Sequence, residues 1–286
     1  ENQAISASLR YFNLGKIQFT DALGNDLQLF NPREFSFDLG YSRKLSQKLA
    51  LGISLRYINS NLAGSNTFGG QTYKAASAVA GDLSLYHTSG KEDGSGLSYG
   101  VTLTNLGSKI SYTSDANQKD YIPANLGIGL AYTKVFDETN KLTFALDLNK
   151  LMVPTPPSLS TTTGGTGTAA DSLALIKYRT QGPVSSWFKS FGDAPGGFSE
   201  EIKEVQASIG AEYWYNNQFA FRAGYFYENP LKGNRKYFTL GAGLKYNMFG
   251  MNFAYLLPSG NGITRNPLSN TLRFSILFDF AGKSAK

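Results

Sequence analysis

The sequence predicts an all-β fold, an antiparallel transmembrane β-barrel of outer-membrane type. Segments with an apolar residue at every second position recur along the 286-residue chain, and aromatic residues make up 14 % of it while charged residues make up only 17 %. Short connections between these segments alternate with long ones, which is the pattern of such barrels. No run approaches the ~20 continuous apolar residues of a membrane helix, so any spanning structure must be a closed barrel.

The hairpin over 205–227 shows the alternation most clearly. A turn at 216–218 places Tyr215 opposite Phe219 on an apolar face and Glu212 opposite Arg222 on the other face. In a soluble sandwich the aromatic face would be the core, whereas in an outer-membrane barrel it would face lipid and the ion pair would lie in the lumen.

A second hairpin decides between these two readings. Strands over 35–41 and 49–57, joined by a turn at 46–48, place Asp38 opposite Arg56 on the less apolar face. Two independent hairpins that pair opposite charges on this face favour a polar lumen, so Asp38, Arg56, Glu212 and Arg222 are candidate lumen pairs.

The remaining connections complete the predicted topology. The other strands are expected over about 5–19, 73–87, 97–105, 126–133, 142–149, 238–246, 251–257 and 272–280, which makes twelve in all. Short connections lie at 46–48, 88–96, 137–141, 216–218 and 247–250, and long ones at 20–33, 59–72, 106–122, 152–203, 228–235 and 258–270. We expect one barrel over 1–280 with short turns in the periplasm and long loops outside, followed by a tail over 281–286.

The loop over 152–203 exceeds the ~12 to 15 residues typical of structureless connections. Its low-complexity part, 158–171, is expected to be mobile, while Ser185 to Phe191 predicts a short capped helix with Trp187, Phe188 and Phe191 on one side. These aromatic residues must pack on neighbouring loops, enter the bilayer interface or meet another protein, so they form a candidate partner-binding loop.

Composition and motifs give no sign of an enzyme, a cofactor or a metal site. The chain has no cysteine, which excludes thiolate chemistry, and the net charge of +6 comes from scattered Lys and Arg without the basic stripe of a nucleic-acid-binding protein. The single histidine, His87, shares the outward parity of Leu83 and Leu85, whereas Asp82 and Ser84 point inward, which argues against a Ser-His esterase. The inward carboxylates Asp38, Glu212, Asp147 and Asp279 are interpreted as lumen packing.

Several segments carry a family resemblance. They are ENQAISASLRYFNLGKIQF (1–19), NPREFSFDLGYSRKLSQKLALGISLRYI (31–58), NLGSKISYT (105–113), YIPANLGIGLAY (121–132), LDLNKLMVPTPP (146–157) and ENPLKGNRKYFTLGAGLKYNMFGMNFAYLLP (228–258). With these segments the chain resembles the PorV family, outer-membrane proteins of the type IX secretion system of Bacteroidetes, whose fold is similar to that of the FadL fatty-acid transporters.

The resemblance implies a fourteen-stranded barrel, with one more hairpin before Glu1, where we expect a preceding segment. It also implies a non-enzymatic partner of the SprA (Sov) translocon that receives the C-terminal signal domains of secreted cargo and delivers them to the PorU attachment complex. Outer-membrane lipid is the remaining expected partner. The alternative is a FadL-like channel for hydrophobic small molecules, which the polar residues of the predicted lumen disfavour. A third hypothesis, a lipid-modifying enzyme, would depend on His87 alone.

Overall fold

The computed structural model describes residues 2–20, 23–62, 64–68, 70–91, 93–115, 118–157, 168–259 and 270–280. Its main element is a twelve-stranded antiparallel sheet in which neighbours in space follow the chain. The strands are β1 (Gln3–Asn13), β4 (Arg33–Lys44), β5 (Leu49–Asn61), β8 (Ala76–Thr88), β9 (Gly96–Gly107), β10 (Asn125–Val135), β11 (Asn140–Leu151), β12 (Gln206–Tyr215), β13 (Phe219–Tyr227), β14 (Lys236–Tyr246), β15 (Phe249–Pro258) and β16 (Leu272–Phe278). The predicted fold class and the number of strands are confirmed.

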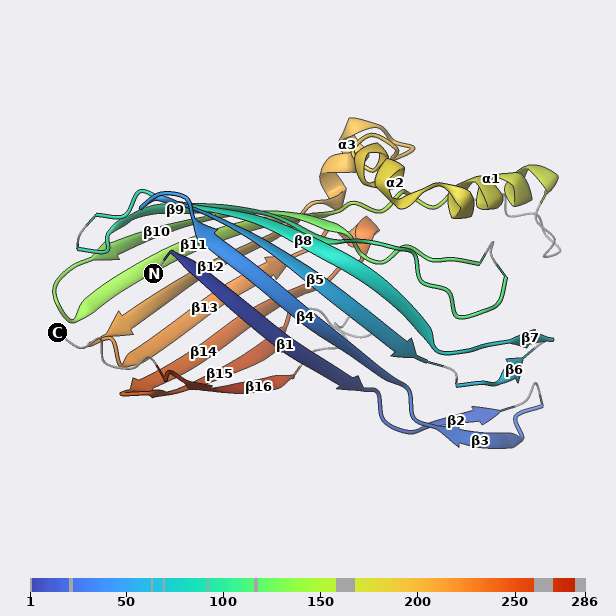
Figure 1. The fold of residues 1–286 in the computed structure, drawn as a ribbon, viewed down its shortest axis with the longest axis horizontal. Coiled ribbons are helices and arrows are strands. Elements are labelled where there is room, and N and C mark those ends of the chain that lie inside the picture. Colours follow the sequence, from blue (N-terminus) through green and yellow to red (C-terminus); the bar gives the residue numbers. More distant parts are fainter. Residues whose placement is uncertain are drawn as a thin grey trace.

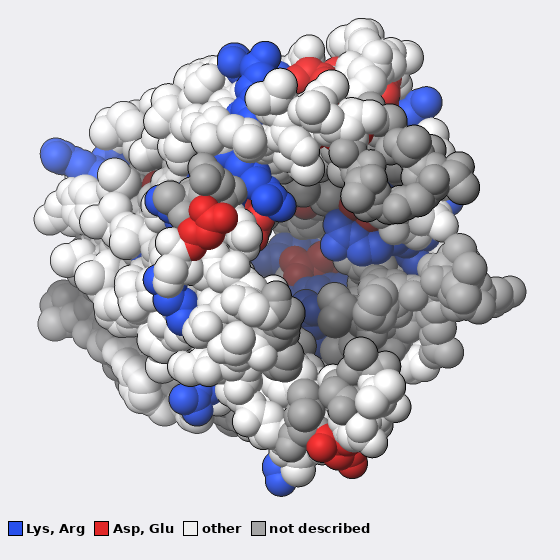
Figure 2. Space-filling model, turned by 90° about the vertical axis from the view of Figure 1, so that its right-hand side faces the viewer, with Lys and Arg blue, Asp and Glu red and all other residues white. Residues whose placement is uncertain are grey.

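The sheet curls around a central hollow (Figures 1 and 2). Its hydrogen-bonded order begins at β1 and ends at β16, and no pairing between these two strands occurs within the described ranges. Short turns, the start of β1 and the end of β16 lie at one end, called here the turn end, and the described parts of the long connections lie at the other, the loop end (Figure 1).

The outer face of the sheet is apolar and exposed. Leu55 on β5 and Phe221 on β13, for example, are both more than half exposed. A soluble protein would bury such a face in a core, whereas lipid covers it in a membrane barrel. The exposed aromatic face therefore identifies the sheet as an outer-membrane β-barrel wall.

Both hairpins predicted from the sequence have the expected register. Tyr215 pairs with Phe219 and Glu212 with Arg222, and Asp38 pairs with Arg56. Asn216 and Asn217 have φ of 52° and 51°, a left-handed conformation that asparagine tolerates better than most residues. The local turn chemistry thus fixes which side chains share a face.

The expected first strand, 5–19, is wrong in its extent. β1 ends at Asn13, and a separate two-stranded hairpin of β2 (Ile17–Thr20) and β3 (Asp26–Phe30) follows. Gly15 lies between β1 and β2 and has φ of +81°, a conformation that ends an extended strand. A second small hairpin, β6 (Thr67–Phe68) with β7 (Gln71–Thr72), precedes β8, which begins at Ala76 rather than at residue 73.

The long loop holds three short helices, α1 (Ala169–Thr180), α2 (Pro183–Lys189) and α3 (Phe198–Glu201), followed by the 3-10 turn η1 (Ile202–Glu204). Most of the part expected to be mobile, 158–167, lies outside the described residues, but Thr168 and Asp171 form a reciprocal cap that starts α1. The helix expected at 185–191 begins two residues earlier, and Pro183 rather than a side-chain cap starts it. None of the described helices has the length and apolar character needed to cross a membrane.

Candidate functional site

The inner faces of β4, β5, β8 and β9 form what we call the packed side of the lumen. Arg56 on β5 forms salt bridges with Asp38 on β4 and with Asp82 on β8, the latter at 2.9 Å. Its guanidinium also donates to the side chain of Asn105 on β9, whose backbone amide donates to Asp82 at 2.8 Å. The side chains of Arg56 and Asp38 are only 12 % and 10 % exposed. One cation is therefore shared by two carboxylates, the buried Asp38 and the 17 % exposed Asp82.

The connection over 108–124, described at 108–115 and 118–124, turns back into the lumen against this side. Ile110 and Ile122 pack on three small inward residues of β8, and the set forms a buried apolar cluster. Tyr112, on the same connection, donates to the hydroxyl of Ser60, which in turn donates to the carboxylate of Glu34 at 2.5 Å. The small residues that make room for this connection are Ala76, Ala78 and Ala80.

A pocket of about 730 Å³ remains beside this connection at the loop end. Its lining mixes apolar residues such as Phe12 and Ile58 with the charged residues Arg10, Glu34 and Arg56. Charged groups within the hollow are visible from the loop end (Figure 2). The wall of the pocket is thus mainly apolar, with a few charged residues set into it.

The inner faces of β10 to β13 form the contrasting hollow side. Glu212 accepts from the guanidinium of Arg222 at 2.6 Å, and Arg222 also donates to Asn252 at 2.9 Å. The side chains of Arg222 and Glu212 are 32 % and 34 % exposed. The same type of cross-strand pair is therefore about three times more open to water here than on the packed side.

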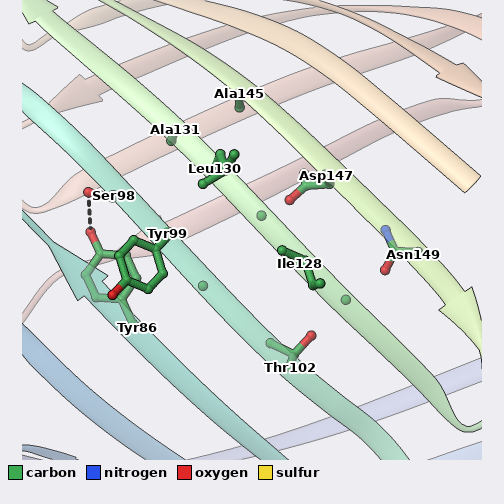
Figure 3. A pocket seen from close by; sticks show the side chains of 13 residues that line it. Tyr86, Ser98, Tyr99, Thr102, Ile128, Leu130, Ala131, Ala145, Asp147 and Asn149 are labelled. Atoms are coloured by element: carbon green, nitrogen blue, oxygen red, sulfur yellow. Dashed lines mark hydrogen bonds between the residues drawn. The ribbon is translucent and has the colours of Figure 1, made fainter.

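A hollow of about 360 Å³, centred on β10, occupies the neighbouring wall (Figure 3). Gly127 and Gly129 on β10 line it, and side chains of the neighbouring strands lie close over them, Thr102 over Gly127 and Asp147 over Gly129. Tyr86 donates to Ser98 at 3.1 Å at the turn-end side of the hollow (Figure 3). Asp279, which the sequence placed within the last strand, lies just past the end of β16.

Ion pairs fasten the helical loop to the rim at the loop end. Lys150, at the end of β11, pairs with Glu201 at 2.9 Å and with Glu204 at 2.6 Å. Lys232, in the 3-10 turn η2 (Pro230–Lys232), pairs with Glu204 at 2.9 Å and with Glu200 at 2.7 Å. We call this five-residue network the clasp; its members are Lys150, Glu200, Glu201, Glu204 and Lys232.

Glu200 and Glu201 of the clasp have lowered pKa values. A hydrogen bond from Lys232 is the main cause for the pKa of Glu200. Burial raises the pKa of Glu201, but hydrogen bonds from the Ala194 amide and from Lys150 outweigh it and lower the pKa. Both groups are therefore held as carboxylates that complete the clasp.

Helix α1 is fastened at its C-terminal end to the inward connection. The hydroxyl of Tyr121 donates to the backbone carbonyls of Tyr178 and Gln181, both at 2.9 Å. Lys109 donates to the carbonyl of Arg179 at 2.6 Å and lies over the ring of Tyr121. Burial raises the pKa of Tyr121 to about 12. These donors satisfy the carbonyls that a helix end leaves free.

The three aromatic residues predicted for partner binding differ in exposure. Phe188 is 74 % exposed, and Phe191 is also exposed, whereas Trp187 is half-buried beside the fully buried Ser186. Phe188 and Phe191 are therefore the accessible members of the predicted set. The exposed stripe is Val184, Phe188 and Phe191.

His87 lies on the outer face, as its parity predicted. Its ring stacks on Tyr99 with centroids 4.7 Å apart. Asp82 is committed to Arg56 on the inner face. The three residues considered for an esterase, His87, Asp82 and Ser84, are thus divided between opposite faces of β8.

Sequence reasoning missed most of the residues that organise the lumen and its rim. It did not single out Asp82 or Asn105 as partners of Arg56, nor Lys150 as the cation of the clasp. The inward parity of Asp82 was a usable signal, because it lies on the strand next to Arg56. The pairing of Lys150 with Glu204 joins residues 54 positions apart and has no local signal.

The fold and the site together define an outer-membrane β-barrel protein with a partly filled lumen and a helical cap clasped to one rim. The family model of the type IX secretion system protein PorV matches residues 1–158. The chain therefore belongs to the PorV family. A comparison with curated proteins gave no match.

Among solved structures, the toluene transporter TbuX of Ralstonia pickettii is similar at a TM-score of 0.49 and 14 % identity, over 91 % of this chain and 74 % of that one. The toluene transporter TodX of P. putida gives a TM-score of 0.47 and 13 % identity, over 96 % of this chain and 77 % of that one. The CymD monoaromatic hydrocarbon channel gives 0.43 and 12 %, over 96 % and 84 %.

Proposed function

We propose that this protein is a non-enzymatic outer-membrane component of the type IX secretion system that binds other proteins at its loop end. It associates with the SprA (Sov) translocon, receives the C-terminal signal domain of secreted cargo and delivers it to the PorU complex for surface attachment or release. Membership of the PorV family supports the secretion system, and the exposed stripe of α2 supports the binding site.

The exposed stripe is the observation that carries the proposal. Val184, Phe188 and Phe191 remain exposed on α2 and just after it, and the clasp residue Lys150 lies over the ring of Phe191 at 5.7 Å from its centroid. A rigidly held aromatic group loses little conformational entropy on binding, which is typical of interface hot spots. The stripe is thus the best candidate contact for a translocon or cargo surface.

A matched pair of substitutions on α2 tests this assignment. Phe188→Ala should weaken capture of translocon or cargo by roughly thirtyfold, or about 2 kcal/mol, while barrel assembly stays normal. Trp187→Ala should lower cap stability as well, because the side chain is half-buried. Copurification from membranes with mass spectrometry, together with a secretion assay, reads both effects. Normal capture and secretion by the Phe188 variant would move the site elsewhere, to the loops at 20–33 and 258–270 first.

The proposal requires the loop end to face outside the cell. The chain has no native cysteine, so single cysteines can be placed at Ser172 in α1 and at Asn217 in a turn, both exposed. A membrane-impermeant maleimide applied to intact cells should label position 172 only. Labelling at position 217 instead would show that the loop end faces the periplasm, where the cap could not meet cargo outside the cell.

We do not favour the alternative function, a channel for hydrophobic small molecules. Such a channel needs an apolar pocket in the lumen. The loop-end pocket has a mainly apolar wall, but the charged residues Arg10, Glu34 and Arg56 interrupt it. Ile110 and Ile122 of the neighbouring connection fill the space against β8. Mass spectrometry of the extracted protein would find fatty acid or another apolar compound if this alternative were correct.

A further inference from the structure

A groove crosses the outer face of the sheet at β12 and β13. Its floor is the cross-strand pair Ala211 and Ala223. Phe144 on β11 and Leu240 on β14 continue the same row on either side. The next outward pairs along these strands are larger, Tyr213 with Phe221 toward the turn end and Ile209 with Tyr225 toward the loop end. The two alanines therefore leave a depression between them. The groove is lined by Phe144, Ile209, Tyr225 and Phe238.

The lining of the groove selects an apolar occupant. The groove has a volume of about 510 Å³ and no charged residue in its wall. The rings of Tyr225 and Phe238 pack against each other with centroids 4.8 Å apart and form its loop-end wall. Because neighbouring strands lie ~4.8 Å apart, a floor two strands wide has room for a single hydrocarbon chain.

The depth of the groove indicates where this occupant comes from. Ala211 lies at the middle of β12, between Tyr213 and Tyr215 toward the turn end and Tyr225 and Tyr227 toward the loop end. Aromatic residues of this kind mark the two membrane interfaces of a barrel. The groove therefore lies at the level of the hydrocarbon layer, where acyl chains surround the protein.

We propose that the groove is a specific site for one phospholipid acyl chain. An empty depression would leave its wall atoms without dispersion contacts, and a flexible chain can restore them. The outward rows of β4 and β5 offer no such depression at the same depth, since Leu39 lies directly opposite Leu55 there. A side chain of a partner protein is the competing occupant, and the experiments below distinguish the two.

The first experiment maps lipid contacts on the unmodified protein. The protein is reconstituted in nanodiscs of phosphatidylethanolamine in which a fraction of the acyl chains carries a diazirine, and cross-linked residues are located by mass spectrometry. Cross-links at Ile209, Ala223 and Tyr225 should exceed those at Leu39 and Leu55 several-fold. Equal labelling at both places would overturn the proposal.

The second experiment fills the groove. Ala211→Leu combined with Ala223→Leu should abolish the excess cross-linking, whereas Ala242→Leu, which adds the same group at an outward position between Phe221 and Phe253, should keep it. Persistence in the filled variant would overturn the proposal. A benzophenone amino acid at position 223 in native membranes should react with lipid, and reaction with a polypeptide would instead identify a protein as the occupant. The cross-linking map of the unmodified protein tests the proposal even if a variant fails to assemble.

Discussion

The packed and hollow sides of the lumen use the same cross-strand pair in different surroundings. On the packed side Arg56 forms salt bridges with two carboxylates and its side chain is 12 % exposed. On the hollow side Arg222 forms a salt bridge with one carboxylate and its side chain is 32 % exposed. The free energy of a stranded charge depends on how much water reaches it, so two pairs that look equal in sequence should differ in their contribution to stability.

The difference follows from what each side packs against. Small residues on β8 pack against Ile110 and Ile122 of the connection between β9 and β10, and Arg56 on the neighbouring strand β5 is only 12 % exposed. On the hollow side the described residues that line the hollow centred on β10 all belong to the strands β8, β9, β10 and β11, so no such connection is among them. Loop packing rather than strand pattern therefore decides how exposed a charged residue of the lumen is.

The largest effect is expected from removing the shared cation. Arg56→Met leaves Asp38 and Asp82 buried without a charge partner and should cost about 3 to 5 kcal/mol. Chemical unfolding in detergent micelles measures the loss. Arg10→Met is the control, because Arg10 has no ion pair in the described part of the chain and should cost far less. Equal losses in the free energy of unfolding would show that burial does not determine how much each arginine contributes to stability.

Overfilling the lumen should distinguish the two sides by volume. Ala78→Leu forces a larger side chain under Ile110 and Ile122 and should cost about 1 to 3 kcal/mol. Ala145→Leu adds the same volume beside the open hollow and should be nearly neutral. Protease cleavage of the connection over 108–124 should rise in the first variant only. A neutral Ala78→Leu would mean that this connection does not pack as described.

Breaking the exposed pair should have a smaller effect. Arg222→Ala should cost on the order of 1 kcal/mol, because water screens the remaining carboxylate of Glu212. Exchanging the two charges, Glu212→Arg with Arg222→Glu, should recover part of this loss. Unfolding midpoints compare the single and double variants. A loss equal to that of Arg56→Met would remove the distinction between the two sides.

Acid should loosen the cap before it affects the sheet. The pKa values of Glu200 and Glu201 are lowered from 4.5 in the folded protein, so their contribution is complete above pH 4.5 and is lost as the pH falls through the lowered values. Trp187 fluorescence should therefore change reversibly in acid while strand circular dichroism persists. Lys150→Met should remove part of this pH dependence, since it breaks two of the ion pairs of the clasp. An unchanged transition in that variant would exclude the clasp as its cause.

The sequence was a good guide wherever the determining interaction is local. Alternation and turn residues placed the hairpins of Asp38 with Arg56 and Glu212 with Arg222 in the correct register, because a shift by one residue would turn every side chain to the other face. It failed at Gly15, where one left-handed residue ends β1 inside an otherwise continuous pattern. Another residue at position 15 would leave the alternation of apolar residues unchanged, so this alternation alone does not show where β1 ends.

The sequence by itself thus determined the all-β class, the strand registers, the outward position of His87 and the family resemblance. Only the tertiary structure decided that Ile110 and Ile122 pack on the inner face of β8, and that Trp187 is half-buried while Phe188 is exposed. It also decided that Lys150 meets Glu204. The physical reason is range: strand pairing follows from residues a few positions apart, whereas these contacts form only after the curled sheet brings distant connections to one rim.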